Sequence, residues 1–298
     1  MGFAVPESAG DLIVAFIQEF FGSIFLYLLF FPFGAILGNT IEGWVFHFLA
    51  VIGFDILTAG ACANPMVCIA LYFSGKLTFN GTAVRVCAEV LVAFIGFSIL
   101  HSIVPERMID LTGGPELAAG VDVYYGCLIE GLISFLFALT VLLASSFVTD
   151  PEFARPLFAT VLRLLIEVSA PITGANMNTM IGFSWAFYTN RAYSQEYQMV
   201  YTISPLIGGV AAAGAYCMIM TIFFPKYNDP DIPVSPEKML LGVVKKSEVE
   251  MLKKDDLSHS PKKAPETPTK SRKESSEARS VTRSQTKELK SRKKKQNR

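Results

Sequence analysis

Two asparagines, Asn64 and Asn178, stand in strongly apolar parts of the chain, in the segments GACANPMVC and TGANMNTM. Each is followed by an apolar stretch, 66–73 and 180–188, that is too short to cross a bilayer. Asparagine is a favoured helix N-cap, because its side-chain oxygen accepts hydrogen bonds from backbone N–H groups of the first turn. Each asparagine therefore predicts the start of a short buried helix, and Pro65 fits the first position of the first one.

Capping uses the side-chain oxygen of each asparagine and leaves its NH₂ group free to donate hydrogen bonds. Irregular backbone at membrane depth is tolerated only where it packs inside protein or lines a wet cavity. Two half-helices that enter from opposite faces would meet at the bilayer centre, with both free amides and both positive dipole ends aimed into one passage. The alternative is that Asn64 and Asn178 only cap buried helices. Asn176 is expected to tie down the loop before Asn178.

Two glutamates, Glu19 and Glu130, lie in apolar helical stretches, one upstream of each asparagine. The two glutamates are 111 residues apart and the two asparagines are 114 residues apart. Such similar spacing predicts one ancestral unit used twice. An unpaired carboxylate inside a bilayer is costly and needs nearby donors. The alternative for these glutamates is an ionised group in a hydrated crevice without a specific role.

The elements that must position these residues are membrane spans. Of the 298 residues, 51% are hydrophobic, and six stretches are apolar enough to cross a bilayer core of about 30 Å. The stretches are 12–37, 43–59, 84–104, 124–148, 154–171 and 199–224. We predict an all-α integral membrane protein with six transmembrane helices plus two re-entrant half-helices. The two halves, at about 10–105 and 122–224, form an inverted repeat, because three spans each must make them point in opposite directions.

The charges divide the chain near Pro225. Only 6 of the 26 Lys and Arg residues precede residue 226, against 15 of the 26 Asp and Glu residues. We therefore predict an integral membrane domain over 1–225 and a disordered basic cytoplasmic tail over 226–298, because the tail has too little apolar surface to fold. The tail either binds anionic lipid headgroups or is simply solvated. It is almost free of aromatic residues that could stack on bases, so nucleic acid is not an expected partner.

Lysine and arginine near the spans favour the cytosolic side of a membrane. The basic tail, with Lys76, Arg85 and Arg155 in the second and fourth connections, predicts that both termini are cytoplasmic. The histidines within the spans have no metal-ligand partner at a useful spacing, and no nucleophile pairs with a base. We therefore expect no cofactor, no metal site and no enzymatic activity.

With these motifs, the chain resembles the aquaporin, or major intrinsic protein, family across nearly the whole of residues 10–224. The Asn-Pro-Ala motif of that family reads here as Asn64-Pro65-Met66 and Asn178-Thr179-Met180. The segments ANPMVCIALYFSGKLT and NRAYSQEYQMVYTISPLIGG are most similar to the unorthodox superaquaporins, a subfamily with altered motifs that is often found in intracellular membranes.

The resemblance implies a passive transmembrane channel for water or small neutral solutes such as glycerol or hydrogen peroxide. It implies a homotetramer with one pore per subunit, in an endomembrane such as the endoplasmic reticulum or in the plasma membrane. Asn64 and Asn178 would hydrogen-bond the solute, and Glu19 and Glu130 would hold the carbonyl groups of the re-entrant loops. The alternative is a poorly conducting or closed family member that acts as a membrane scaffold.

The constriction is where the sequence departs most from that family. The usual arginine, three residues after the second asparagine, is replaced by Ile181. The other constriction positions fall at Trp44, Ile166 and Ala175. This ring offers few donors to a solute, so it resembles a hydrophobic gate. Without the arginine, exclusion of cations would depend on the half-helix dipoles.

Arg163 lies inside the fifth predicted span, and intramembrane ionisable residues are functional candidates. Its spacing of three residues to Ile166 places it near the constriction, as a candidate pore charge. Its spacing of four residues to Glu167 equally favours an ion pair that neutralises both groups.

Cys62 and Glu89 are further residues of the first half with a predicted place in the membrane. Cys62 stands two residues before Asn64, where many family members have histidine, and it is a candidate site for thiol reagents. Its alternative role is that of a small hydrophobic residue. Glu89 stands where the family commonly has glutamine, and no role for it follows from the sequence.

Overall fold

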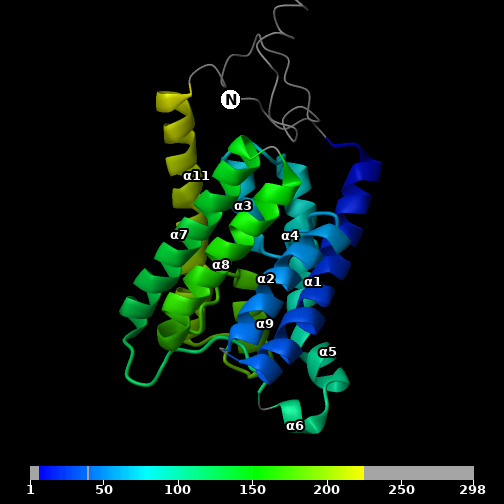
Figure 1. The fold of residues 1–298 in the computed structure, drawn as a ribbon, viewed down its shortest axis with the longest axis vertical. Coiled ribbons are helices and arrows are strands. Elements are labelled where there is room, and N and C mark those ends of the chain that lie inside the picture. The colour runs from blue at the N-terminus through cyan, green and yellow to red at the C-terminus, as the bar shows by residue number, and fades with distance from the viewer. Residues whose placement is uncertain (1–6, 39, 110, 149, 225–298) are drawn as a thin grey trace, which may run out of the picture. The chain divides into compact units, whose positions relative to one another are not determined.

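A computed structural model describes residues 7–38, 40–109, 111–148 and 150–224, and the regular secondary structure of these residues is helical. Figure 1 shows the long helices running side by side in a bundle. The predicted disordered tail, 226–298, lies outside the described residues.

The first half contains two long helices, a half-helix and a bent span. The elements are α1 (Ala9–Leu37), α2 (Ile41–Leu57), the half-helix α3 (Pro65–Phe73), α4 (Phe79–Ala93), α5 (Gly96–Ile103) and the short α6 (Glu106–Ile109). The span predicted at 84–104 is therefore not one straight helix, because α4 and α5 meet at an angle of 46°. Gly96 begins α5, and a Cβ atom there would lie 2.5 Å from the ring of Tyr27, so glycine is required for this close packing.

The second half repeats the same order of long helix, long helix, half-helix and last span. The elements are α7 (Val123–Phe147), α8 (Pro151–Thr173), the half-helix α9 (Thr179–Tyr188), α10 (Gln195–Gln198), the π-helical turn η1 (Met199–Ile203) and α11 (Ser204–Phe223). The last span begins at Gln195, four residues before the predicted 199, because Ser194 caps α10 by accepting the N–H of Tyr197.

The two half-helices approach each other from opposite ends of the bundle. Figure 1 shows α3 in the upper part and α9 in the lower part of the molecule. Both begin at a capping asparagine, Asn64 for α3 and Asn178 for α9. This arrangement is the inverted repeat with re-entrant half-helices that the sequence predicts.

Close packing of α7 against α11 holds the second half together. A Cβ atom on Gly208 of α11 would overlap the carbonyl oxygen of Gly131 on α7. Small residues permit such close approach of helices inside a membrane, where van der Waals packing drives helix association. The small-residue run around Gly208 therefore serves helix packing.

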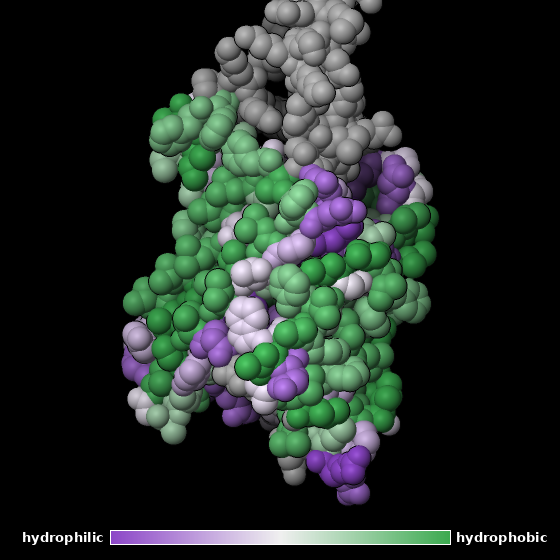
Figure 2. All heavy atoms as spheres, viewed as in Figure 1, coloured by the Kyte–Doolittle hydropathy of each residue, from purple (hydrophilic) through white to green (hydrophobic). Residues whose placement is uncertain are grey.

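The outer surface of the bundle is apolar, as lipid contact requires. Within the described residues, four helical segments are long and apolar enough to span a membrane, and the bent pair α4 and α5 makes a fifth. The 17 residues of α2 stand at the lower end of the usual span length. Large side chains such as Ile13, Phe21 and Leu128 are more than half exposed. Figure 2 shows hydrophobic residues covering most of the visible face.

Candidate functional site

The site begins with the two asparagine caps. The side-chain Oδ1 of Asn64 accepts the backbone N–H of Met66 at 3.1 Å, and Pro65 occupies the first helical position. The Oδ1 of Asn178 accepts the N–H of Met180 at 3.0 Å and that of Ile181 at 3.5 Å. Both asparagines have extended backbone, as an N-cap requires. The predicted caps are confirmed.

The two amide groups join the halves of the molecule. The Nδ2 of Asn64 donates to the carbonyl oxygen of Met177 at 2.9 Å, and the Nδ2 of Asn178 donates to that of Ala63 at 2.8 Å. The prediction that the amides are free is therefore wrong. The half-helices meet end to end, so the carbonyl just before one cap is an acceptor for the other cap. Each amide carries two N–H donors, and one of them stays outside this pair of bonds.

The two accepting carbonyls belong to residues with an unusual backbone conformation. Ala63 has φ = +45° and Met177 has φ = +47°. For residues with a side chain this left-handed region is sparsely populated and costs about 1–3 kcal/mol. Both residues are buried and directly precede a capping asparagine. The same strained turn therefore occurs at equivalent positions of the two halves.

Glu19 of α1 holds the first loop in place. Its carboxylate accepts the backbone N–H of Cys62 at 2.9 Å and that of Ala63 at 2.8 Å. The side chain is buried. The expectation that this glutamate holds carbonyl groups is wrong, because an ionised carboxylate is only an acceptor and must pair with N–H groups.

Glu130 of α7 performs the same task in the second half, and the same correction applies. Its carboxylate accepts the N–H groups of Asn176 and Met177, each at 2.9 Å, and the hydroxyl of Thr173 at 2.5 Å. The side-chain amide of Asn176 lies 3.5 Å from the carbonyl oxygen of Tyr201. Asn176 thus ties down its loop, as the sequence predicts.

Glu89 of α4 is a third buried carboxylate at this site, and sequence reasoning assigned it no role. Its Oε1 accepts the backbone N–H of Asn64 at 2.7 Å, so it extends the series of N–H groups that Glu19 holds. The same Oε1 lies 3.6 Å from the sulfur of Cys68. The available signal was an acidic residue in an otherwise apolar span.

Arg163 of α8 makes two contacts. It pairs with Glu167 at 3.0 Å, so the predicted ion pair forms. Its guanidinium carbon also lies 5.5 Å from the centre of the Trp44 ring on α2, within range of a cation–π interaction. The sequence did not predict this second contact. It places a positive charge beside one of the four predicted constriction residues.

The four predicted constriction residues contact different neighbours in the structure. Ile166 and Ala175 pack against the same buried cluster, which includes Met177. Ile181 packs against another cluster, formed mainly by α1, α4 and α5, while Trp44 lies against Arg163. Each of the four predicted positions is partly exposed.

A pocket of about 560 Å³ lies beside α9, and one of its lining residues, Gly174, directly precedes Ala175. It is lined by His101, Gly113, Gly114, Glu116, Gly174, Trp185 and Tyr188. A Cβ atom on Gly114 would overlap the Trp185 side chain, so glycine lets the segment between α6 and α7 lie against this ring. Sequence reasoning missed the pocket, although the Gly113-Gly114 pair was a signal for a close approach.

Glu116 is the charged residue of this pocket. It accepts the indole N–H of Trp185 at 3.0 Å and forms an ion pair with Arg191. Burial raises the pKa of Glu116, but the hydrogen bonds from Arg191 and Trp185 lower it more, so the net pKa lies below its ordinary value. The carboxylate is therefore ionised at neutral pH. Through its bond with Trp185 it fixes the segment between α6 and α7 to α9.

The chain is similar in sequence to several known proteins. The Arabidopsis thaliana protein "Aquaporin SIP1-1" is 31% identical over 173 residues, which cover 56% of this chain and 70% of that protein. The Zea mays protein "Aquaporin SIP1-2" is 32% identical over 161 residues, or 52% of this chain and 64% of that protein. The Homo sapiens protein "Aquaporin-4" is 26% identical over 162 residues, or 53% of this chain and 49% of that protein.

The fold is also that of a solved channel structure. The X-ray structure of the aquaglyceroporin from Plasmodium falciparum aligns with a TM-score of 0.58 at 18% identity, over 73% of this chain and 99% of that one. The model of the family described as "Major intrinsic protein" matches residues 8–216. The chain therefore belongs to the major intrinsic protein family, and it is similar to the SIP, or superaquaporin, members of that family.

Proposed function

We propose that this protein conducts water and small neutral solutes, such as glycerol or hydrogen peroxide, through a passage at the junction of Asn64 and Asn178. The observation that carries this proposal is the reciprocal pair of bonds from Asn64 to Met177 and from Asn178 to Ala63. These bonds bring two side-chain amides and two helix N-termini to one point. Such a point offers N–H donors to the oxygen of a neutral solute.

The same geometry disfavours cations. The N-terminus of each half-helix carries a partial positive charge equivalent to roughly half an elementary charge. Arg163 adds a full charge beside Trp44, although Glu167 compensates part of it. Because Ile181 replaces the usual arginine, the constriction is less polar than in the Asn-Pro-Ala members. We expect it to slow water more than it slows a solute with apolar CH groups.

A second candidate function is that of a closed family member used as a membrane scaffold. Met66 and Met180, which stand where the family motif has alanine, are fully buried next to the junction. Two such long side chains fill space that alanine would leave open. This packing favours a closed passage in at least one state of the protein.

The remaining parts of the proposal concern assembly and location. We propose a homotetramer with both termini in the cytosol, in the endoplasmic reticulum or the plasma membrane, and a tail that contacts anionic lipids. The exposed apolar faces of the long helices support a membrane assembly. The relatives named above are aquaporins and an aquaglyceroporin, so we propose a channel and no enzymatic activity.

Flux through liposomes tests the function. The purified full chain is placed in vesicles, and light scattering follows their volume under water and glycerol gradients. We expect the Asn178→Leu variant to reduce flux to that of empty vesicles, because leucine removes the amide and fills the junction. The matched control is Asn80→Leu, at an exposed asparagine at the start of α4. It should keep the full rate.

Two outcomes would contradict the channel proposal. A folded Asn178→Leu variant that conducts at the full rate would show that the passage lies elsewhere. A wild-type protein whose flux equals that of empty vesicles would favour the scaffold. A fluorescent fusion that follows the protein to one membrane decides its location.

A further inference from the structure

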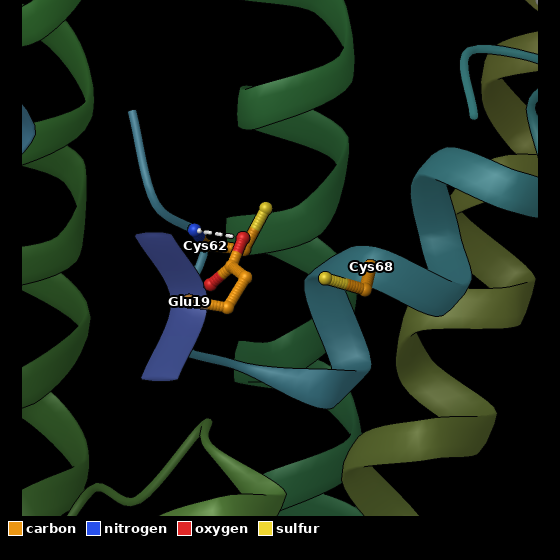
Figure 3. Close-up of side chains that lie close together, drawn as sticks. All are labelled: Glu19, Cys62 and Cys68. Carbon is orange, nitrogen blue, oxygen red and sulfur yellow. Dashed lines mark hydrogen bonds between the residues drawn. The ribbon is translucent and has the colours of Figure 1, made fainter. Parts of the chain in front are cut away.

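Two cysteines and a glutamate converge close to Asn64. Figure 3 shows Glu19 from α1, Cys62 from the loop before α3 and Cys68 from α3 itself lying close together, with the Cys68 sulfur on the side of Glu19. One ligand atom from each residue lies within 4.8 Å of the others. Glu19 is 43 positions away from Cys62 in the chain, so only the fold assembles this group.

The donor set suits a borderline or soft metal ion. Two thiolates and a carboxylate are ligands of Zn²⁺, whereas Mg²⁺ prefers oxygen ligands alone. Tetrahedral Zn²⁺, with Zn–S near 2.3 Å and Zn–O near 2.0 Å, places its ligand atoms roughly 3.3–3.8 Å apart. The three ligand atoms lie within 4.8 Å of one another. To bind a metal ion they must therefore approach one another by at most about one ångström, which side-chain rotation can provide.

Glu89 supplies the fourth ligand. Its Oε1 lies 3.6 Å from the sulfur of Cys68. Its Oε2 is buried and has no hydrogen-bond partner within the part of the chain that the structure describes. A buried polar atom without a partner is costly. A metal ion beside Cys68 would give this oxygen a ligand bond.

The charges around the group also favour a cation. The carboxyl groups of Glu19 and Glu89 accept the successive backbone N–H groups of Cys62, Ala63 and Asn64, so both lie at the same loop. Arg85 is the nearby positive group, but its Nε lies 3.8 Å from Glu19, and its Nη1 makes a shorter contact of 3.0 Å with Glu7. Buried charges need close partners. A divalent cation beside the two carboxyl groups would be a closer positive partner than Arg85.

The position of the group connects it to the passage. Cys62 as a whole residue is half-buried, while Cys68 and Glu19 are buried. Cys62 directly precedes Ala63, whose carbonyl accepts the amide of Asn178. An ion bound here would fix the loop that forms one side of the junction.

We propose that Glu19, Cys62 and Cys68, with Glu89 as the fourth ligand, form a site for Zn²⁺ or a similar soft divalent cation, and that its binding closes the passage. One Zn²⁺ replaces the two thiol protons and any proton on the carboxyl ligands, so binding forms two Zn–S bonds and releases at least two protons. Only the closure rests on the proposed channel function; the binding does not.

Direct titration tests the site. Zn²⁺ is titrated into the reduced full chain in detergent, with calorimetry and a pH indicator as readouts. We expect one ion to bind and at least two protons to be released per chain. Cys62→Ser and Cys68→Ser should each weaken binding by at least about tenfold, since even outer-shell partners of a metal are worth 10–100-fold. Cys87→Ser, at an exposed cysteine of α4, is the control and should bind normally.

Two further arms make the titration specific. Glu89→Gln keeps an oxygen that can accept the N–H of Asn64, so it should fold and yet bind Zn²⁺ more weakly. Mg²⁺, a hard cation, should not bind. Equal Zn²⁺ affinity in the wild type and in both Cys62→Ser and Cys68→Ser would overturn the proposal.

Flux in liposomes tests the closure. Zn²⁺ should inhibit flux in the wild type and in Cys87→Ser, a chelator should restore it, and Cys68→Ser should be insensitive. Zn²⁺ inhibition that persists equally in Cys62→Ser and Cys68→Ser would place the inhibiting ion at another site and overturn the proposed closure. Binding to a protein that conducts nothing even without Zn²⁺ would overturn the channel function and support the metal site.

Discussion

The side-chain amide of Asn64 donates to the carbonyl oxygen of Met177 at 2.9 Å, across the boundary between the two halves of the chain. Asn178 returns the same bond to Ala63 at 2.8 Å. The groups that we propose to face the solute are therefore also the groups that lock the halves together. Conduction and stability should respond to the same substitutions.

Replacing Asn178 with alanine tests this lock. The change removes an N-cap, worth about 1 kcal/mol, and leaves the buried Ala63 carbonyl without its donor, at about 1–3 kcal/mol. We expect the free energy of unfolding to fall by about 2–4 kcal/mol, measured by denaturant titration in detergent. Asn80→Ala is the control. An Asn178→Ala protein as stable as the wild type would show that the bond contributes nothing.

Glu130→Gln tests the support of the second loop. A glutamine has one acceptor oxygen and an NH₂ group, so it cannot accept both the Asn176 and the Met177 N–H groups. Hydrogen bonds to a charged group contribute about 1.5–3 kcal/mol, and we expect a loss of that size in the free energy of unfolding. Thermal unfolding of Glu130→Gln is compared with that of Glu152→Gln, an exposed residue of α8. Equal stability of the two variants would contradict the assigned role.

Variants of Arg163 test two possible roles of this residue, in protein stability and in the exclusion of cations. Arg163→Leu removes the 3.0 Å ion pair with Glu167, and because the Glu167 side chain is 35% exposed we expect the free energy of unfolding to fall by only about 1–2 kcal/mol. The double variant Arg163→Leu/Glu167→Leu should recover this stability, since neither charge remains. If the charge beside Trp44 excludes cations, both variants should leak K⁺ in a vesicle assay. Tight vesicles with either variant would assign Arg163 to the ion pair alone.

Gly208 and Gly214 of α11 form a matched pair for the packing of the last span. A Cβ atom on Gly208 would overlap Gly131 of α7, whereas one on Gly214 has nothing within 4 Å among the described residues. Gly208→Ala should destabilise the protein by about 1–3 kcal/mol through overpacking. Gly214→Ala should be neutral or stabilising, because alanine favours the helix by about 1 kcal/mol. The midpoints of thermal unfolding in detergent decide between them, and equal effects would contradict the close contact.

Lys76, between α3 and α4, predicts how stability depends on pH. Burial lowers its pKa from the ordinary 10.5 to about 8, although it donates to Ser146 and lies 5.3 Å from the Tyr216 ring centre. Between these two values the unfolded chain binds a proton that the folded chain does not. The free energy of unfolding should therefore rise as pH rises through this window, by at most about 3 kcal/mol.

The control for this pH dependence is Lys76→Met, which keeps the apolar stem and removes the titrating group. Unfolding of both proteins is followed in detergent at pH 7.5 and 9.5. We expect the wild type to gain stability relative to Lys76→Met at the higher pH. A parallel change in the two proteins would show that other groups cause the dependence.

Local patterns in the sequence predicted the main elements. The half-helices, their caps at Asn64 and Asn178, and the repeat of two similar halves follow from hydrophobicity and capping, which depend on neighbouring residues. The bend at Gly96 was missed, because it depends on contact with Tyr27 from another helix. The start of the last span was misplaced for the local reason that the cap at Ser194 was not recognised.

By itself, the sequence determined that this is a membrane protein with an inverted repeat, and that Glu19, Glu130 and the two capping asparagines belong to its centre, whereas it gave Glu89 no role. Only the tertiary structure decided how they pair. It showed that the glutamates hold N–H groups, that each asparagine amide reaches the opposite loop, and that Cys68 lies beside Glu19 and Cys62. The physical reason is that these contacts join residues far apart in the chain, and hydrogen-bond geometry is settled only when the half-helices meet.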